Sequence, residues 1–204
     1  MNKVVLNCML ILGILISSNF VIAQESNFDP FKLKAEYFND KGVKDKMVFS
    51  DKKGNSFKIK KSDFSNGVYI KQGEKWLKHG VWLSTYEGRI TEKIVYSFGK
   101  KHGVRESYYE NGKVQFEDQF VKGVQQGISF QYRADGTKVY ECPYVIGKKE
   151  GVKIEYERNG SISFKKNYKN GKLQGEYLQY NNDGKLVART YYELGKQVGK
   201  TEWY

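Results

Sequence analysis

Glycine recurs in this sequence every 24 residues, in a pattern that leaves few folds open. Each period contains a first glycine, a second glycine four residues later, and a third glycine nine residues after the second. From position 99 onward, every glycine occupies one of these three places. A fixed period of this length is typical of repeat architectures, in which each unit packs only against its neighbours.

The third glycine of each period follows Asn or Asp, as in Asn111-Gly112 and Asp135-Gly136. Such pairs favour tight turns between antiparallel strands, because Asn and Asp tolerate positive φ and glycine has no side chain to oppose it. The flanking residues alternate with the period of two that is typical of strands. Each 24-residue unit is therefore predicted to be a β-hairpin. The residues that define the repeats are Gly103, Tyr108, Gly112, Gly127, Tyr132, Gly136, Gly151, Tyr156, Gly160, Gly175, Tyr180 and Gly184.

Successive hairpins joined by Gly-x-x-x-Gly connectors predict an all-β fold. The expected architecture is an elongated antiparallel β-meander that lengthens by two strands, or about 9.6 Å, per repeat. We expect the apolar residues before each turn, such as Val104, to share one face with the aromatic residues after it, such as Phe116, and the polar residues to occupy the other face. The aromatic residues are interpreted as packing of the sheet, with a ligand-binding platform as the alternative. Two aromatic ladders are expected, one from Tyr108, Tyr132, Tyr156, Tyr180 and Tyr204, the other from Phe120, Tyr144, Tyr168 and Tyr192.

The composition agrees with strands and offers few groups for catalysis. The chain has 204 residues, of which 15% are aromatic, with only 2 His and 2 Cys. This composition argues against a helical bundle, a zinc scaffold and a disulfide-stapled miniprotein. His79 and His102 stand where later repeats have Glu150 and Gln174, so we interpret both histidines as turn residues. We predict a protein that is not an enzyme, with no catalytic, cofactor-binding or metal-binding residues.

The first residues have the pattern of a secretory signal peptide. Lys3 precedes an apolar run of 13 residues, and Val21-Ile22-Ala23 matches a small-residue cleavage site. The run is shorter than the roughly 20 residues that span a bilayer, although an uncleaved anchor is the alternative. We predict cleavage after Ala23 and a secreted or periplasmic protein. The expected organisation is a signal peptide at 1–23, a leader with eroded repeats or a distinct cap at 24–72, and a repeat sheet at 73–204.

The charge of the chain favours anionic partners. After cleavage of the signal peptide, which removes Lys3, the chain would have 34 basic and 23 acidic residues. Such an excess of positive charge steers a protein toward anionic surfaces. Most lysines lie in the turns and do not alternate with aromatic residues, a pattern that disfavours a groove for nucleic acid. Lysines in turns are equally explained as charges that keep the loops soluble. After cleavage of the signal peptide, which contains Cys8, Cys142 would be the single thiol of the chain. We interpret it as a small core residue. The candidate interaction surface consists of Lys100, Lys101, Arg105, Lys148, Lys149, Lys153, Lys172 and Tyr177.

One connector reads Gly99-Lys100-Lys101-His102-Gly103 and recurs with changes from Gly147 to Gly151 and from Gly171 to Gly175. A tyrosine follows each second glycine by five residues. This pattern resembles MORN repeats, and more closely the bacterial MORN-repeat variant family, over residues 80–204. Some members of that family are regarded as antitoxin or immunity partners of secreted toxins. The resemblance therefore implies a toxin-neutralising protein, and the export signal implies a toxin that acts outside the cytoplasm.

Together, these features predict an exported, non-catalytic repeat protein that acts as a protein–protein interaction scaffold. The alternative function is electrostatic binding to an anionic membrane or polysaccharide surface. The two functions differ in their response to salt, because exposed charge interactions are screened within about 8 Å at 0.15 M ionic strength. Nucleic acid is not expected as a partner.

Overall fold

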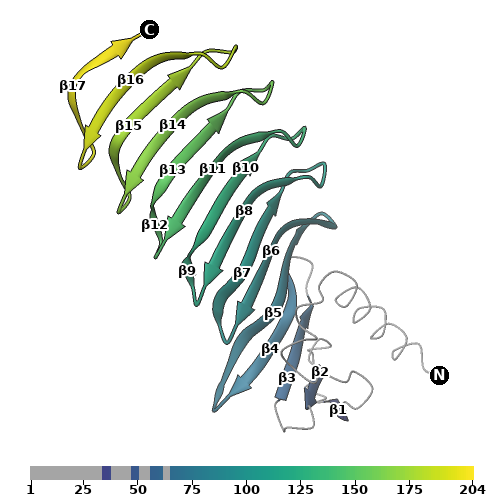
Figure 1. Ribbon diagram of the computed structural model, residues 1–204. Coiled ribbons are helices and arrows are strands. Elements are labelled where there is room, and N and C mark those ends of the chain that lie inside the picture. Colours follow the sequence, from purple (N-terminus) through teal and green to yellow (C-terminus); the bar gives the residue numbers. More distant parts are fainter. Residues whose placement is uncertain (1–33, 38–46, 51–55, 62–64) are drawn as a thin grey trace.

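The computed structural model describes residues 34–37, 47–50, 56–61 and 65–204, which form one antiparallel β-sheet (Figure 1). The predicted signal peptide and its cleavage after Ala23 concern residues outside these ranges. Within the ranges, no helix is long and apolar enough to cross a bilayer.

The sheet is a meander, as predicted: each strand pairs with the next one along the chain, except that β9 and β10 both pair with β8, and β12 and β13 both pair with β11. Successive strands are added at the same edge, so the sheet extends in one direction from the N-terminal to the C-terminal strands (Figure 1). The first four strands are β1 (Lys34–Tyr37), β2 (Met47–Ser50), β3 (Ser56–Lys61) and β4 (Ser65–Gln72). The repeats begin with β5 (Lys75–Tyr86), β6 (Arg89–Ser97), β7 (Lys100–Tyr108) and β8 (Val114–Val121). They continue through β9 (Val124–Gln125), β10 (Gly127–Tyr132), β11 (Lys138–Val145), β12 (Lys148–Lys149) and β13 (Gly151–Tyr156). The last strands are β14 (Ile162–Lys169), β15 (Lys172–Tyr180), β16 (Leu186–Glu193) and β17 (Lys196–Trp203).

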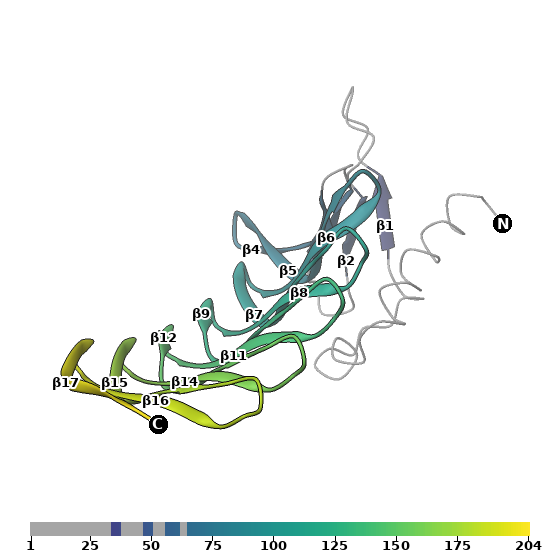
Figure 2. The same cartoon turned by 90° about the horizontal axis from the view of Figure 1, so that it is seen from above.

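The second glycine of each connector bends its strand. Gly103 lies inside β7 with a φ of 95°, a conformation that glycine adopts without steric cost. At the equivalent Gly127 and Gly151 the bend interrupts the strand, so that β9 and β10, like β12 and β13, are two halves of one strand. The bends recur in register, and Figure 2 shows that the sheet curves across its width into a long trough.

Two kinds of turn alternate along the sheet, and their positions differ from the prediction. The two-residue turns lie in the connectors, where Lys122 and Gly123 both have positive φ, 50° and 91°. The turn at Asn111-Gly112 is longer: Gly112 donates to the carbonyl of Tyr109 over 2.9 Å, and only Gly112 has positive φ, at 79°. Hairpins with such turns add a one-residue bulge. In the first three such turns the Asn or Asp therefore supplies a side-chain acceptor and not positive φ, as Asn111 Oδ1 does for the Lys113 amide over 3.1 Å. In the last one Asn181 is the acceptor instead.

The unit that starts at Gly80 is one residue shorter than the others. Its turn is reduced to Glu87-Gly88, both at positive φ, between the paired residues Tyr86 and Arg89. The missing residue is thus lost from the turn, and the strands on either side keep the pairing of the other repeats.

The predicted division of residues between the two faces is wrong. Directly opposed residues share a face, and Phe116 is opposed to Ser107, which lies on the face of Arg105. The face opposite to Phe116 carries Val104 and Glu106. The cause is the register shift between Ser107 and Tyr108 at the bulged turn, which changes the alternation of side chains by one residue. Both faces therefore mix aromatic and charged side chains.

We call the face of Arg105 and Phe116 the inner face and the other the outer face. The described part of the chain is a single layer, so side chains become buried mainly where the sheet curves toward them. Six of the buried residues lie on the inner face: Trp82, Ile94, Ser129, Cys142, Ala188 and Thr190. The inner face is thus the concave side of the trough.

Both predicted aromatic ladders occupy equivalent register positions, but on opposite faces. The Tyr108 ladder is on the outer face, where the Tyr108 hydroxyl donates to Glu106 over 2.8 Å. On the inner face, Phe120 is opposed to Gly103 and Tyr144 to Gly127. Each inner ring thus lies beside a strand position that has no side chain, an arrangement that shields the glycine backbone.

A ladder of side-chain hydrogen bonds joins successive repeats. The residue before each second glycine accepts a hydrogen bond from the backbone amide of the next connector turn. The pairs are His79 with Phe98 (3.4 Å), His102 with Lys122 (3.4 Å), Gln126 with Ile146 (3.0 Å), Glu150 with Asn170 (2.7 Å) and Gln174 with Leu194 (3.0 Å). The interpretation of the histidines as turn residues thus has a physical basis, because His, Gln and Glu all provide an acceptor.

Replacing Ile146 with asparagine should stabilise the protein. Ile146 has a φ of 49°, although a β-branched residue is strained there, and its side chain is 75% exposed. Asn170 holds the equivalent position at 52°. We expect Ile146→Asn to raise the free energy of unfolding by about 1 kcal/mol, measured by thermal and urea denaturation. The neighbouring Val145→Asn, which relieves no positive φ, should give no gain; equal effects would contradict the explanation.

Acidic pH should weaken the contact that His79 makes. Burial lowers the pKa of His79 from its usual 6.5, so the folded protein favours the neutral ring that accepts from Phe98. The stability from this contact is therefore present above pH 6.5 and is lost as the pH falls through the lower folded-state pKa. Melting temperatures across pH 7.5 to 5 should fall less for His79→Gln, the residue found at position 126, than for the unmodified protein. Parallel curves would refute the assignment.

Candidate interaction surface

A continuous row of side chains runs along the centre of the inner face, across every repeat strand from β7 to β17. Cross-strand pairing and two hydroxyl contacts define its order. The row consists of Arg105, Asp118, Ser129, Cys142, Lys153, Lys166, Tyr177, Thr190 and Thr201. Polar groups thus occupy the middle of the trough. The side nearest the connectors is lined by one aromatic residue per repeat, namely Tyr96, Phe120, Tyr144, Tyr168 and Tyr192.

The first charged cluster of the row is centred on Arg105. Its guanidinium contacts Glu92 Oε1 over 2.7 Å and Asp118 Oδ2 over 3.0 Å. Asp118 also accepts hydrogen bonds from Ser129 (2.7 Å) and Gln125 (3.0 Å). Burial opposes the charge of Arg105, but the two carboxylates outweigh burial and raise its pKa. Arg105, predicted as an interaction residue, is therefore engaged within the sheet.

The second charged cluster is centred on Glu155. Its Oε1 atom accepts from Lys153 over 2.6 Å and from Lys166 over 2.9 Å. Burial opposes the ionisation of Glu155, but these hydrogen bonds outweigh burial and lower its pKa. Two lysines share one carboxylate, so the cluster keeps a positive charge. Lys153 also lies over the ring of Tyr140, with 4.4 Å between Nζ and the ring centroid.

Two further lysines of the inner face rest on aromatic rings. Lys101 lies over Phe120 and Lys149 over Tyr168, each 5.0 Å from the ring centroid. Within the described part of the chain, neither lysine forms a salt bridge. Not every lysine of the connectors therefore extends into a turn, because Lys101 and Lys149 lie on aromatic rings of the inner face.

A separate basic strip follows the connector turns, which form one long edge of the sheet. We call it the connector edge. Lys100, Lys148 and Lys172 are exposed there, and each packs its Cβ against the glycine of the next connector turn. Exposed apolar side chains lie among them, including Val121 (47%) and Val145 (44%). The eight predicted surface residues therefore fall on two surfaces: five on the inner face and these three lysines on the connector edge.

Sequence reasoning missed several inner-face residues. Asp118, Glu155 and Lys166 hold the charged clusters together, but nothing in their repeat positions distinguishes them. Their partners lie on neighbouring strands, so only the strand register brings them into contact. The signal that could have identified them is opposite charge at opposed positions, which requires the correct bulge in each turn.

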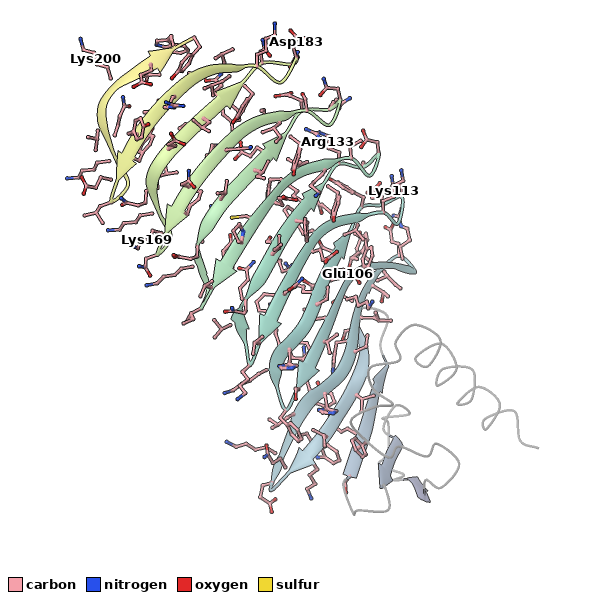
Figure 3. All side chains as sticks on the ribbon, viewed as in Figure 1. Glu106, Lys113, Arg133, Lys169, Asp183 and Lys200 are labelled. Carbon is pink, nitrogen blue, oxygen red and sulfur yellow. The ribbon has the colours of Figure 1, made fainter. Side chains whose placement is uncertain are left out.

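A shallow hollow of about 130 Å³ marks the C-terminal end of the inner face. Its lining combines an aromatic and an apolar side with hydroxyl and amide groups. The lining residues are Tyr177, Gln179, Ala188, Thr190, Thr201 and Trp203. Figure 3 shows side chains projecting from the sheet along its length, from the β4–β5 region to β17.

Potential metal ligands and nucleophiles are present within the described residues. No group of three or more His, Cys, Asp or Glu in the described ranges is placed to hold a metal ion. Cys142 is 1% exposed, which confirms it as a core residue, and burial raises the pKa of its thiol. Burial, with smaller effects of neighbours that include Cys142, likewise raises the pKa of Tyr144 to about 12.

Comparison with known proteins identifies the repeats. The family model described as "MORN repeat variant" matches residues 101–122, 149–170 and 173–194. No curated protein matches significantly. One similar solved structure is a point mutant of S. aureus TarM in complex with Fondaparinux, alpha-GlcNAc-glycerol and UDP, with 16% identity and a TM-score of 0.28 over 58% of this chain. This chain spans only 21% of that one, and so low a TM-score supports no conclusion. The family match falls on three β-hairpins, β7–β8, β13–β14 and β15–β16, and these three hairpins are therefore MORN repeats of the variant type.

Proposed function

We propose that this protein is a non-catalytic scaffold that binds a partner protein in the trough formed by its MORN repeats. The observation that carries the proposal is the continuous inner row of mainly charged and hydroxyl-bearing side chains from Arg105 to Thr201. A long surface of this kind, repeated on a rigid solenoid, suits an extended partner. Toxin neutralisation by occlusion is the proposed process, and export through the N-terminal signal is the proposed route.

The test is affinity capture from envelope and culture-supernatant extracts of the native host, washed at about 0.15 M and then about 1 M salt. A protein partner should remain in near-equal amount through the high-salt wash. Were it a toxin, one equivalent of this protein should abolish its activity. Retention of nothing but lipid or polysaccharide, released by salt, would reject the proposal.

The connector edge supports a second candidate function, which is binding to an anionic envelope surface. Exposed Lys100, Lys148 and Lys172 lie beside exposed Val121 and Val145, a combination suited to headgroups and the acyl boundary. Sedimentation with vesicles that contain or lack anionic lipid would test it. Binding confined to anionic vesicles and lost on replacing these three lysines with glutamine would favour this function over the first.

A further inference from the structure

The inner face of the repeat sheet carries more basic than acidic side chains. From β6 to β17 its basic residues are Lys101, Arg105, Lys149, Lys153 and Lys166, against the acidic Glu92, Asp118 and Glu155. Positive charge thus predominates in the trough.

The surplus positive charge of the trough belongs to lysines that, among the residues the structure describes, have no carboxylate partner or share one. Lys101 and Lys149 have no carboxylate partner in the described residues, and they are held on the rings of Phe120 and Tyr168. Lys153 and Lys166 share the single carboxylate of Glu155. Because the rings and Glu155 already restrict these lysines, less side-chain entropy is lost when an anion binds.

We infer that the trough binds an acidic polypeptide segment that lies along the inner face and places an apolar side chain in the hollow between Tyr177 and Trp203. This inference rests on the proposed function and names the chemistry of the partner. Carboxylates of the segment pair with the lysines over the rings. The hollow, of about 130 Å³ and lined by Ala188 as well as by Thr190 and Gln179, accepts an apolar or aromatic side chain.

The inner face fits a polypeptide better than a uniformly anionic polymer. Asp118 and Glu155 are fixed in the middle row, and a polymer with an anion in every unit would bring charge against both. A polypeptide can vary its side chains, with acidic groups near Lys101 and Lys149 and neutral groups elsewhere. The mixed hollow beside Trp203 likewise offers nothing to a polyanion.

The test uses a fluorescent random copolymer of glutamate and tyrosine, with binding to the full chain followed by anisotropy at about 0.15 M salt. Lys101→Gln/Lys149→Gln removes two inner lysines from their rings. The matched control is Lys138→Gln/Lys165→Gln, which removes two outer lysines that also lie on rings, those of Phe130 and Tyr180. Both variants lose the same charge. We expect the inner variant to bind about tenfold more weakly and the outer variant to stay within about twofold.

Two comparison probes complete the test, namely dextran sulfate and vesicles rich in anionic lipid. Equal losses in both double variants, absence of copolymer binding, or tighter binding of either comparison probe would overturn the inference. Circular dichroism establishes that each variant is folded. The proposed function has its own readout, because capture of a host protein through high salt does not depend on the copolymer. A captured protein insensitive to the inner variant would leave the proposed function in place and reject the acidic segment.

Discussion

Replacing Gly136 with valine is expected to lower the free energy of unfolding by about 3 kcal/mol. Gly136 has a φ of 95° in the turn between β10 and β11, where its amide donates to the carbonyl of Arg133 over 2.8 Å. Space is not the obstacle, since a Cβ at this position would meet only the end of Lys113, 3.8 Å away. The cost arises because a β-branched residue is strongly disfavoured at this φ.

Thermal and urea denaturation measure the effect, and Gly136→Asn is the matched control. Asparagine tolerates positive φ better than valine does, so this variant should lose clearly less stability. Hydrogen exchange should place the loss in the hairpin of β10 and β11 before the rest of the sheet, because repeats interact mainly with their neighbours. Unchanged stability of Gly136→Val would contradict the register of this hairpin.

Replacing Arg105 with alanine should also cost about 3 kcal/mol, although Arg105 was predicted as a binding residue. The substitution removes the cation that Glu92 and Asp118 share, on the two strands that flank β7. The side chain of Asp118 is only 14% exposed, so water compensates it poorly. A lysine at this position should recover part of the loss, since one ammonium can contact one carboxylate but does not reproduce the forked geometry.

The control for this prediction is Arg89→Ala. Arg89 contacts Glu87 over 3.3 Å, but both side chains are largely exposed, at 49% and 63%. Exposed ion pairs contribute little, so this variant should change the stability by less than about 0.5 kcal/mol. Comparable losses in the two variants, measured by urea denaturation, would show that the position of Arg105 in the trough is unimportant.

Much of the fold was predictable because the repeat is encoded locally. Glycine at three fixed places and alternation between them suffice to predict hairpins, and hairpins in series can only extend as a meander. The local rules were less successful at the turns. The pair Asn111-Gly112 was predicted to place positive φ on both residues, whereas the tight turns lie at Lys122-Gly123 and its equivalents. A lysine, a phenylalanine or an isoleucine at positive φ carries no sequence signal, because the surrounding pairing imposes that conformation.

The candidate site was predicted only in part, for the same reason. Lys101, Lys149 and Lys153 could be selected from the sequence as basic residues, but not separated from Lys100 and Lys148 on the connector edge. Sequence distance also concealed the partners: Arg105 is joined to Asp118 and Lys153 to Lys166 across strands. Local patterns cannot show which carboxylate neutralises which lysine.

The sequence by itself determined the repeat, its hairpins and the MORN resemblance, because glycine, Asn and Asp act on the backbone within a few residues. The tertiary structure decided which side chains share a face, since a one-residue bulge at each turn shifts the alternation. It also decided which charges are compensated, because opposed strands bring Arg105 to two carboxylates while Lys101 and Lys149 receive only aromatic rings. Side-chain pairing depends on register, and register is a property of the assembled sheet.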